Sequence, residues 1–369
     1  MPSPAEHDET PAQTATTSSP PAATGEGVDR PTQPNEPSQI EDDHAPIEAA
    51  ETIPADRAGL SDDGYETDRE SSASTSVTSS IRDYEFENSR RYHKFQEGRY
   101  QFPNDEPEQE REDMKHAMVI HLCDGKLHFA PLDNPQNILD IGTGTGIWAI
   151  DMGDEFPEAE ILGIDLSPIQ TPWVPPNVRF MVDDAEAEWV QPPNSLDYIH
   201  IRNMTAAIRD WPTLLSRAYE ALKPGGWIEL QELCLELKCD DGSLKPDNKL
   251  QEWLGLVRQG LMTFGVDMLS MRNNKQRTLD AGFVNVQEKA LKIPFGIWPK
   301  DKRMSMIGLY CRTMMVDALH GVSSKPFLHG LKWTPEQIEV YLVAVRKECY
   351  DYTQHTHIPF TAVTGQKPL

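Results

Sequence analysis

The chain has 369 residues and a formal net charge of −25, with 59 Asp and Glu against 34 Lys and Arg. Nucleic-acid binding depends on basic side chains that neutralise phosphate, so this balance argues against a nucleic-acid partner. The sequence has no signal-like N-terminus and no apolar run near the roughly 20 residues that span a bilayer, so no membrane association is expected. The five cysteines lack zinc spacing. We therefore expect reduced thiols, no metal and an intracellular location, cytoplasmic or nuclear.

The N-terminal segment differs in composition from the rest of the chain. Its first 80 residues contain 17 Asp and Glu, three Arg, no Lys and a single aromatic ring, that of Tyr65. Such a segment cannot bury enough apolar surface to offset the entropy of ordering its backbone. We therefore predict a disordered, acidic, Pro- and Ser-rich tail over residues 1–81 and one folded domain over residues 82–369.

A short apolar strand, three alternating glycines and a helix start follow one another in residues 137–148. Gly142, Gly144 and Gly146 allow a tight turn and let a ligand lie directly against the backbone. The turn follows the first strand, and open α/β sheets bind ligands at the carboxyl ends of their strands. The same type of turn occurs in NAD-dependent enzymes. Their G-x-G-x-x-G fingerprint, however, would require glycine at the position of Ile147, so an NAD-dependent enzyme is an alternative that this spacing disfavours.

Four further strands are predicted over 160–165, 178–182, 196–201 and 227–230, and acidic residues end or follow the first two of them. Asp140 ends the first strand and favours a nearby ammonium group. Asp165 lies where an acid accepts hydrogen bonds from ribose hydroxyls, although it is also suited to cap a helix. Asp183 and Asp184 are both candidates to bind an adenine amino group. Asp184 is favoured because the small Ala185 beside it leaves room for the ring.

Together these residues resemble the class I S-adenosylmethionine-dependent methyltransferases. Residues 140–146 match the first motif of that family, Asp165 its ribose acid, 184–185 its adenine element and 222–226 its Leu-Lys-Pro-Gly-Gly turn. The resemblance implies an α/β fold with a seven-stranded, mostly parallel, Rossmann-like sheet and helices on both faces. It also implies S-adenosyl-L-methionine as the cofactor.

The resemblance further implies which residues contact the cofactor. This set comprises Asp140, Gly142, Thr143, Gly144, Gly146, Asp165, Leu166, Asp184, Ala185 and Arg202. Arg202 is expected to meet the methionine carboxylate, or else to form a surface salt bridge. An N-terminal cap over 82–134 is expected to fold over the cofactor and bring Tyr92, His93 or Tyr100 near the sulfonium. The alternative is that these rings pack at the edge of the domain.

A narrower resemblance points to the fungal secondary-metabolism regulator-like (LaeA-like) subfamily. The segments that carry it are 87–93, 103–106, 165–170 and 199–204. It implies fungal origin and a role in secondary metabolism. It does not distinguish a regulator from a pathway enzyme.

The C-terminal part of the domain contains an insertion. A cofactor-binding core over 135–295 is expected to precede it, and the last strand, over 359–369, to follow it. The insertion over 296–358 has helical patterns over 302–319 and 335–351. We predict a helical substrate lid, with the alternative that its methionine stripe is ordinary core.

No residue of the sequence stands out as a catalytic base. Methyl transfer from a sulfonium depends mainly on positioning, and a base helps when the acceptor is a hydroxyl. His200 is the first candidate base, ahead of His93 and Tyr92, although it also suits a satisfied histidine within a strand. The leading hypothesis is a methyltransferase of fungal secondary metabolism that acts on a small molecule. The alternative is a methyltransferase-like regulator of secondary metabolism and development that acts through protein partners.

Overall fold

The computed structural model describes residues 46–50, 84–87, 90–96 and 98–369. Most of the predicted tail over residues 1–81 therefore lies outside the described residues. The short described piece of that segment contacts the domain, since Ala49 forms an antiparallel bridge with Pro299. The amide of Lys300 also donates a hydrogen bond to the carbonyl of Glu48 at 2.7 Å.

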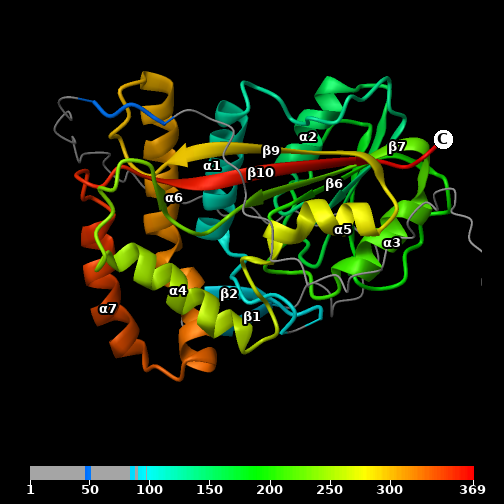
Figure 1. Ribbon diagram of the computed structural model, residues 1–369. Helices are drawn as coiled ribbons and strands as arrows, with labels where there is room; N and C mark the ends of the chain where they lie inside the picture. The colour runs from blue at the N-terminus through cyan, green and yellow to red at the C-terminus, as the bar shows by residue number, and fades with distance from the viewer. Residues whose placement is uncertain (1–45, 51–83, 88–89, 97) are drawn as a thin grey trace, which may run out of the picture. The chain divides into compact units, whose positions relative to one another are not determined.

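An eight-stranded sheet is central to the fold, with the order β5-β4-β3-β6-β7-β10-β8 and with β9 paired to β10 (Figure 1). Its strands are β3 (Asn137–Ile141), β4 (Glu160–Asp165), β5 (Val178–Val182), β6 (Leu196–Arg202), β7 (Leu222–Leu233), β8 (Lys238–Cys239), β9 (Val284–Pro294) and β10 (Thr356–Gln366). The strands from β5 to β7 pair in parallel, whereas β10 is antiparallel to β7, β8 and β9. The predicted mostly parallel sheet is confirmed. The short β8 is an addition that the sequence does not predict.

Helices cover both faces of this sheet. They are α1 (Glu106–Leu122), α2 (Ile147–Glu155), α3 (Trp211–Ala221), α4 (Lys249–Met262), α5 (Asn274–Asp280), α6 (Lys302–Lys325) and α7 (Pro335–Glu348), with short turns η2 (Ser270–Asn273) and η3 (Pro326–Gly330). Strand β3 contributes apolar side chains to both faces of the sheet, because successive residues of a strand point to opposite sides. Ile138 packs with Trp148 and Met152 of α2. Leu139 packs in a separate cluster with Leu214 of α3.

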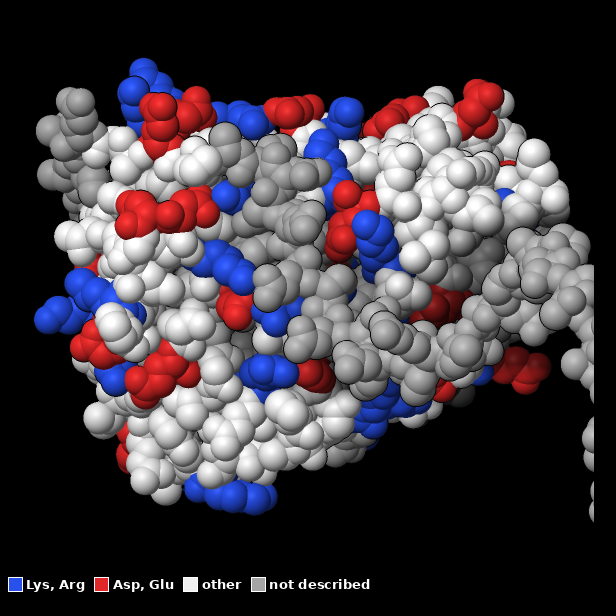
Figure 2. All heavy atoms as spheres, in the orientation of Figure 1, with Lys and Arg blue, Asp and Glu red and all other residues white. Residues whose placement is uncertain are grey.

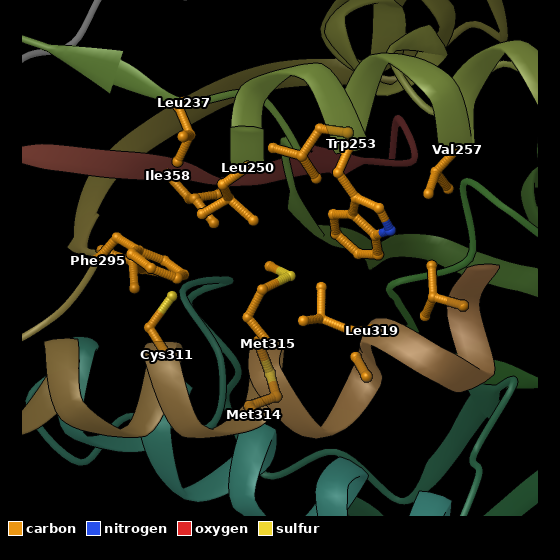
Figure 3. Packing of buried hydrophobic residues seen from close by; sticks show 14 of the residues in the cluster. Leu237, Leu250, Trp253, Val257, Phe295, Cys311, Met314, Met315, Leu319 and Ile358 are labelled. Atoms are coloured by element: carbon orange, nitrogen blue, oxygen red, sulfur yellow. The ribbon is translucent and has the colours of Figure 1, made fainter. Parts of the chain in front are cut away.

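A third hydrophobic cluster joins α1, α4, α6 and α7 to β9 and β10. Figure 3 shows Met315 of α6 pointing toward Trp253 of α4 within this cluster. Both helices begin at side-chain caps, since Asp301 accepts from the amide of Met304 and Asn248 accepts from the amide of Gln251. Such caps satisfy amides that have no partner within the helix. The two helices predicted for the insertion are present, and α6 extends past the predicted end to Lys325.

A two-stranded hairpin, β1 (Tyr84–Glu87) with β2 (Arg90–His93), precedes α1. It is tied to the start of that helix, because Arg90 donates to the capping carboxylate of Asp105 at 2.8 Å. The sequence predicts no hairpin here. Within the part of the chain that the structure describes, no helix combines the length and apolar character needed to cross a membrane.

Candidate functional site

Three adjoining cavities lie at the carboxyl ends of the parallel strands. The glycine-loop cavity, about 1040 Å³ with its solvent-open part, is lined by residues that include Gly142, Gly144, Asp165, Leu166, Asp184 and Ala185. The strand-end cavity, about 400 Å³, is lined by residues that include Asp140, Thr143, Trp148 and His200. The two share Gly144 and Arg202 in their walls. Every predicted cofactor-contacting residue except Gly146 lines one of them.

The glycine loop leaves bare main chain at the cavity wall. Gly142 and Gly144 have φ angles of +71° and +59°, a region that side chains disfavour. A Cβ on Gly142 would lie 2.1 Å from the sulfur of Met204, whereas a Cβ on Gly144 would meet nothing within 4 Å. Gly144 therefore borders the open space where a ligand can approach the backbone.

Gly146 has a structural role instead. It is the residue before α2, with a φ of +85°, and a Cβ there would lie 2.3 Å from the ring of Phe180. Its glycine is required by close packing against β5 and by the left-handed backbone. The sequence pattern predicts that Gly146 contacts the cofactor, but in the structure this residue does not line any of the three cavities.

Asp165 joins the glycine loop to the end of β4. Its Oδ2 accepts from the amide of Gly144 and its Oδ1 from the amide of Ser167, both at 2.9 Å. Burial raises the pKa of Asp165 to about 6, and the negative charges of Asp140 and Glu112 add to the effect. A further hydrogen bond from a hydroxyl or amide group stabilises the charged form of such a buried carboxylate.

His200 lies beneath the loop and holds Asp140. Its Nδ1 is 2.8 Å from Asp140 Oδ1, and its ring stacks on Trp148 with centroids 3.6 Å apart. Thr143 donates to the other Asp140 oxygen at 2.6 Å. The His200 side chain is buried, and its Nε2 makes no hydrogen bond to the described residues. This geometry fits a residue that orients Asp140 better than it fits a base for an acceptor.

Arg202 lines both cavities, and one nitrogen of its guanidinium group has no partner among the described residues. Its Nη2 donates to Nδ1 of His116 at 2.9 Å, and Nε2 of His116 lies 2.8 Å from Asp151. Burial lowers the pKa of His116, which favours the neutral ring that this acceptor role requires. Arg202 Nη1 is buried and, among the described residues, has no hydrogen-bond partner. An arginine donor in this position suits a carboxylate ligand.

The far end of the glycine-loop cavity is held by an ion pair with the cap. Arg99 donates to Asp184 at 3.2 Å and to Glu186 at 3.0 Å. Asp183 also lines the cavity, and one of its oxygens accepts from the amide of Asp184. The small Ala185 lies between the two acids of the pair. The sequence predicted Asp184 at this position but not its partner from the cap.

The predicted cap residues divide between two locations. His93 and Tyr100 line the glycine-loop cavity. Tyr92 is not among the described residues that line any of the three cavities. Its buried ring instead lies under the ammonium group of Lys325, 3.9 Å from the ring centroid. The prediction that Tyr92 approaches the cofactor is therefore not supported, because a cation from the end of α6 holds the ring elsewhere.

A third, methionine-lined cavity of about 730 Å³ adjoins the glycine-loop cavity. Its apolar wall includes Phe102, Leu233, Trp253, Met268, Met314 and Met315. Its polar wall includes Glu232, in which burial raises the pKa to about 7. Asn203 lines all three cavities. Sequence reasoning missed both polar residues.

Helix α1 contributes a charged stripe to the shared wall. Glu112 and Lys115 line all three cavities and pair with each other at 2.5 Å. Their spacing along α1 was a usable signal, because residues three apart share a helix face.

On the molecular face in Figure 2, basic and acidic side chains alternate, and no continuous basic surface is visible among the described residues.

Comparisons with known proteins show what this chain is related to. The family described as "Methyltransferase domain" matches residues 112–288. The methyltransferase pytC of Aspergillus terreus is 40% identical over 317 residues, which are 85% of this chain and 97% of that protein. The secondary metabolism regulator LAE1 of Cochliobolus heterostrophus is 35% identical over 289 residues, 76% of this chain and 94% of that protein.

Among solved structures, Haemonchus contortus phosphoethanolamine N-methyltransferase 2 in complex with S-adenosyl-L-methionine is similar, with a TM-score of 0.40 and 20% identity. The match covers 70% of this chain and 53% of that chain. The identity to pytC, over most of both chains, is what establishes the relationship. The chain belongs to the fungal family that includes the methyltransferase pytC and the secondary metabolism regulator LAE1, and it contains a methyltransferase domain.

Proposed function

We propose that the glycine-loop and strand-end cavities bind S-adenosylmethionine and that the methyl group passes to a small molecule in the methionine-lined cavity. The shared wall carries this proposal, because Tyr100, Glu112, Lys115 and Asn203 line both the glycine-loop and the methionine-lined cavities. Well-oriented reactants can gain ~7–11 kcal/mol from positioning alone. Two adjoining cavities provide such positioning.

The residues of the first two cavities fit the methyl donor part by part. The bare backbone at Gly144 admits close approach, and Asp165 suits the ribose hydroxyls. The free Nη1 of Arg202 suits the carboxylate, and Ala185 leaves space for the adenine ring. When bound there, the donor supplies an activated methyl group on a sulfonium. The side chains bind and orient it.

The methionine-lined cavity supports a small-molecule acceptor. Its volume of about 730 Å³ falls in the ordinary range for ligand pockets, and a mostly apolar wall with a few polar groups is typical of them. Methionine side chains adapt to irregular shapes. The insertion helix α6 contributes Met314 and Met315 to this wall, so we also propose that the insertion acts as a lid over the acceptor.

Calorimetry with S-adenosylmethionine and S-adenosylhomocysteine tests the donor site. Gly144→Ala places a methyl group in the proposed ligand space, and we expect the affinity to fall at least about tenfold. Gly242→Ala is the matched control, since Gly242 also has a positive φ of +76° with nothing within 4 Å of its Cβ. Equal affinities in the two variants, or no binding to the wild type, would refute the proposed donor site.

A regulatory role is the second candidate, supported by the 35% identity to the regulator LAE1. In that case protein partners, rather than a small-molecule acceptor, would mediate the function. Expressing Gly144→Ala in cells that lack the native protein separates the two roles. A role that depends only on partner binding survives the loss of cofactor binding, whereas a catalytic role does not.

A further inference from the structure

Glu232 lines the methionine-lined cavity, and the turn that follows Asn203 holds its carboxylate. Its Oε1 accepts from the amides of Met204 and Thr205, at 2.9 and 3.1 Å. These residues directly follow Asn203, which lines all three cavities. Both amide hydrogen bonds end on Oε1, so they leave the lone pairs of Oε2 to other partners. The carboxylate is thus fixed beside the junction of the cavities.

Asn203 supplies a second hydrogen-bond acceptor at the same junction. Its backbone is left-handed, with φ +56°, and its amide still pairs with the carbonyl of Gln231. Its Oδ1 is buried and has no hydrogen-bond partner in the described part of the chain. Buried polar atoms without partners are rare in proteins, and a ligand donor is one way to satisfy them. Glycine would also fit the left-handed backbone at this position, so the backbone conformation does not explain why the residue carries an amide side chain.

The charged groups of α1 around the cavity are already paired with one another. Arg111 and Lys115 both line the cavity; Arg111 pairs with Glu108 and Glu112, and Lys115 pairs with Glu112. Arg277 of α5 also acts electrostatically on Glu232, so the described part of the wall offers no further unpaired carboxylate to an ammonium group. The remaining wall is largely apolar. A neutral ligand with hydrogen-bond donors therefore matches the cavity better than an ammonium ion does.

Building on the proposed function, we propose that the acceptor is a neutral molecule with an apolar or aromatic skeleton and a hydroxyl group beside a second O–H or N–H donor. Asn203 accepts a hydrogen bond from the second donor. Glu232 accepts the hydroxyl proton as the hydroxyl oxygen bonds to the methyl carbon. The C–S bond breaks and its electron pair stays on the sulfur, which leaves S-adenosylhomocysteine.

The proposed role of Glu232 as proton acceptor depends on pH, because only its ionised form accepts the proton. The ordinary pKa of a glutamate is 4.5, and burial raises that of Glu232 to about 7. Its carboxylate form, which accepts the hydroxyl proton, therefore becomes dominant between about pH 6 and 8. A base poised near the operating pH is the most effective kind.

The test uses the full chain saturated with S-adenosylhomocysteine and three probes: 2,3-dihydroxynaphthalene, 2-naphthol and 2-naphthylmethylammonium. Calorimetry should show the diol binding about tenfold more tightly than the monohydroxyl probe, with the ammonium probe weakest. Asn203→Gly keeps the left-handed backbone but should abolish the preference for the diol. Glu232→Gln should remove the rise in diol affinity between pH 6 and 8. Glu288→Gln is the control, because burial also raises the pKa of Glu288 but this residue lies outside the cavity walls.

Each result decides between the proposals. Failure of the wild type to bind S-adenosylhomocysteine refutes the proposed function itself. If S-adenosylhomocysteine binds, three results each overturn the assignment of the acceptor: no probe binds, the ammonium probe binds most tightly, or the Asn203 and Glu232 variants bind the diol as the wild type does. Methyl-ether formation from the diol, reduced in Glu232→Gln more than its binding is, further separates proton transfer from positioning.

Discussion

The amide of Gly144 donates a hydrogen bond to the Asp165 carboxylate at 2.9 Å, which ties the end of β3 to the end of β4. The bond fixes the glycine loop against the acid that faces the same cavity. The two strongest features of the sequence are therefore one structural unit. A change in Asp165 should alter both the loop and the ligand site.

Replacing Asp165 by Asn should change how stability depends on pH. The ordinary pKa is 3.8, and burial raises it to about 6 in the folded chain. Between these values the folded protein binds more protons than the unfolded one, so wild-type stability falls as pH rises through this window. The stability of the wild type relative to Asp165→Asn should therefore fall by about 2 kcal/mol between pH 4 and 7.

Urea denaturation of both proteins at several pH values measures this difference. Asn also loses one of the two amide hydrogen bonds, which lowers stability equally at every pH. The informative quantity is therefore the slope with pH. A difference that stays constant from pH 4 to 7 would contradict the raised pKa of Asp165.

His200→Phe should act on stability and cofactor affinity more than on acceptor chemistry. Phe preserves the stacking on Trp148 but removes the partner of Asp140 Oδ1. Leaving that buried oxygen unpaired costs about 1–3 kcal/mol. Chemical denaturation and S-adenosylhomocysteine titration should both register the loss. If the variant instead keeps both properties and loses turnover together with its pH dependence, His200 is a base after all.

Much of the fold was predictable because its signals are local. The glycine loop and each strand end are short segments whose residue types decide their conformation. The hairpin was not predicted. Its first strand, 84–87, alternates aromatic and acidic side chains but is only four residues long, and its second strand, 90–93, does not alternate. Its stability depends on partners from elsewhere, such as Asp105 and Lys325.

The site was predictable where strands end and not where distant elements meet. Asp165 and Arg202 are the last residues of β4 and β6, so topology places them at the ligand edge of the sheet. Glu232 lies inside β7, and Lys115 lies within α1. Only packing brings these two to one cavity. Tyr92 failed as a prediction for the same reason, because Lys325 at the end of α6 determines where its ring lies.

Arg99→Ala should speed release of S-adenosylhomocysteine. Arg99 joins the cap to Asp184 and Glu186 at the end of the cavity proposed for the adenine ring. The pair is partly exposed, so we expect a modest effect of up to about 1 kcal/mol, or roughly fivefold in rate. Stopped-flow displacement measures the rate, and added salt should speed release from the wild type but not from the variant. Equal rates in both proteins would show that the cap is held by other contacts.

Arg202→Met should separate the two ends of the methyl donor. Nη1 of Arg202 is the buried donor proposed for the carboxylate, so its loss should weaken S-adenosylhomocysteine binding about tenfold to a hundredfold. 5′-Methylthioadenosine has the same adenosine but no carboxylate, and its affinity should stay unchanged. Arg179→Met is the control, because Arg179 is an exposed arginine of β5 outside the cavities. Equal losses for both ligands would mean that Arg202 supports the whole site through His116 instead of binding the carboxylate.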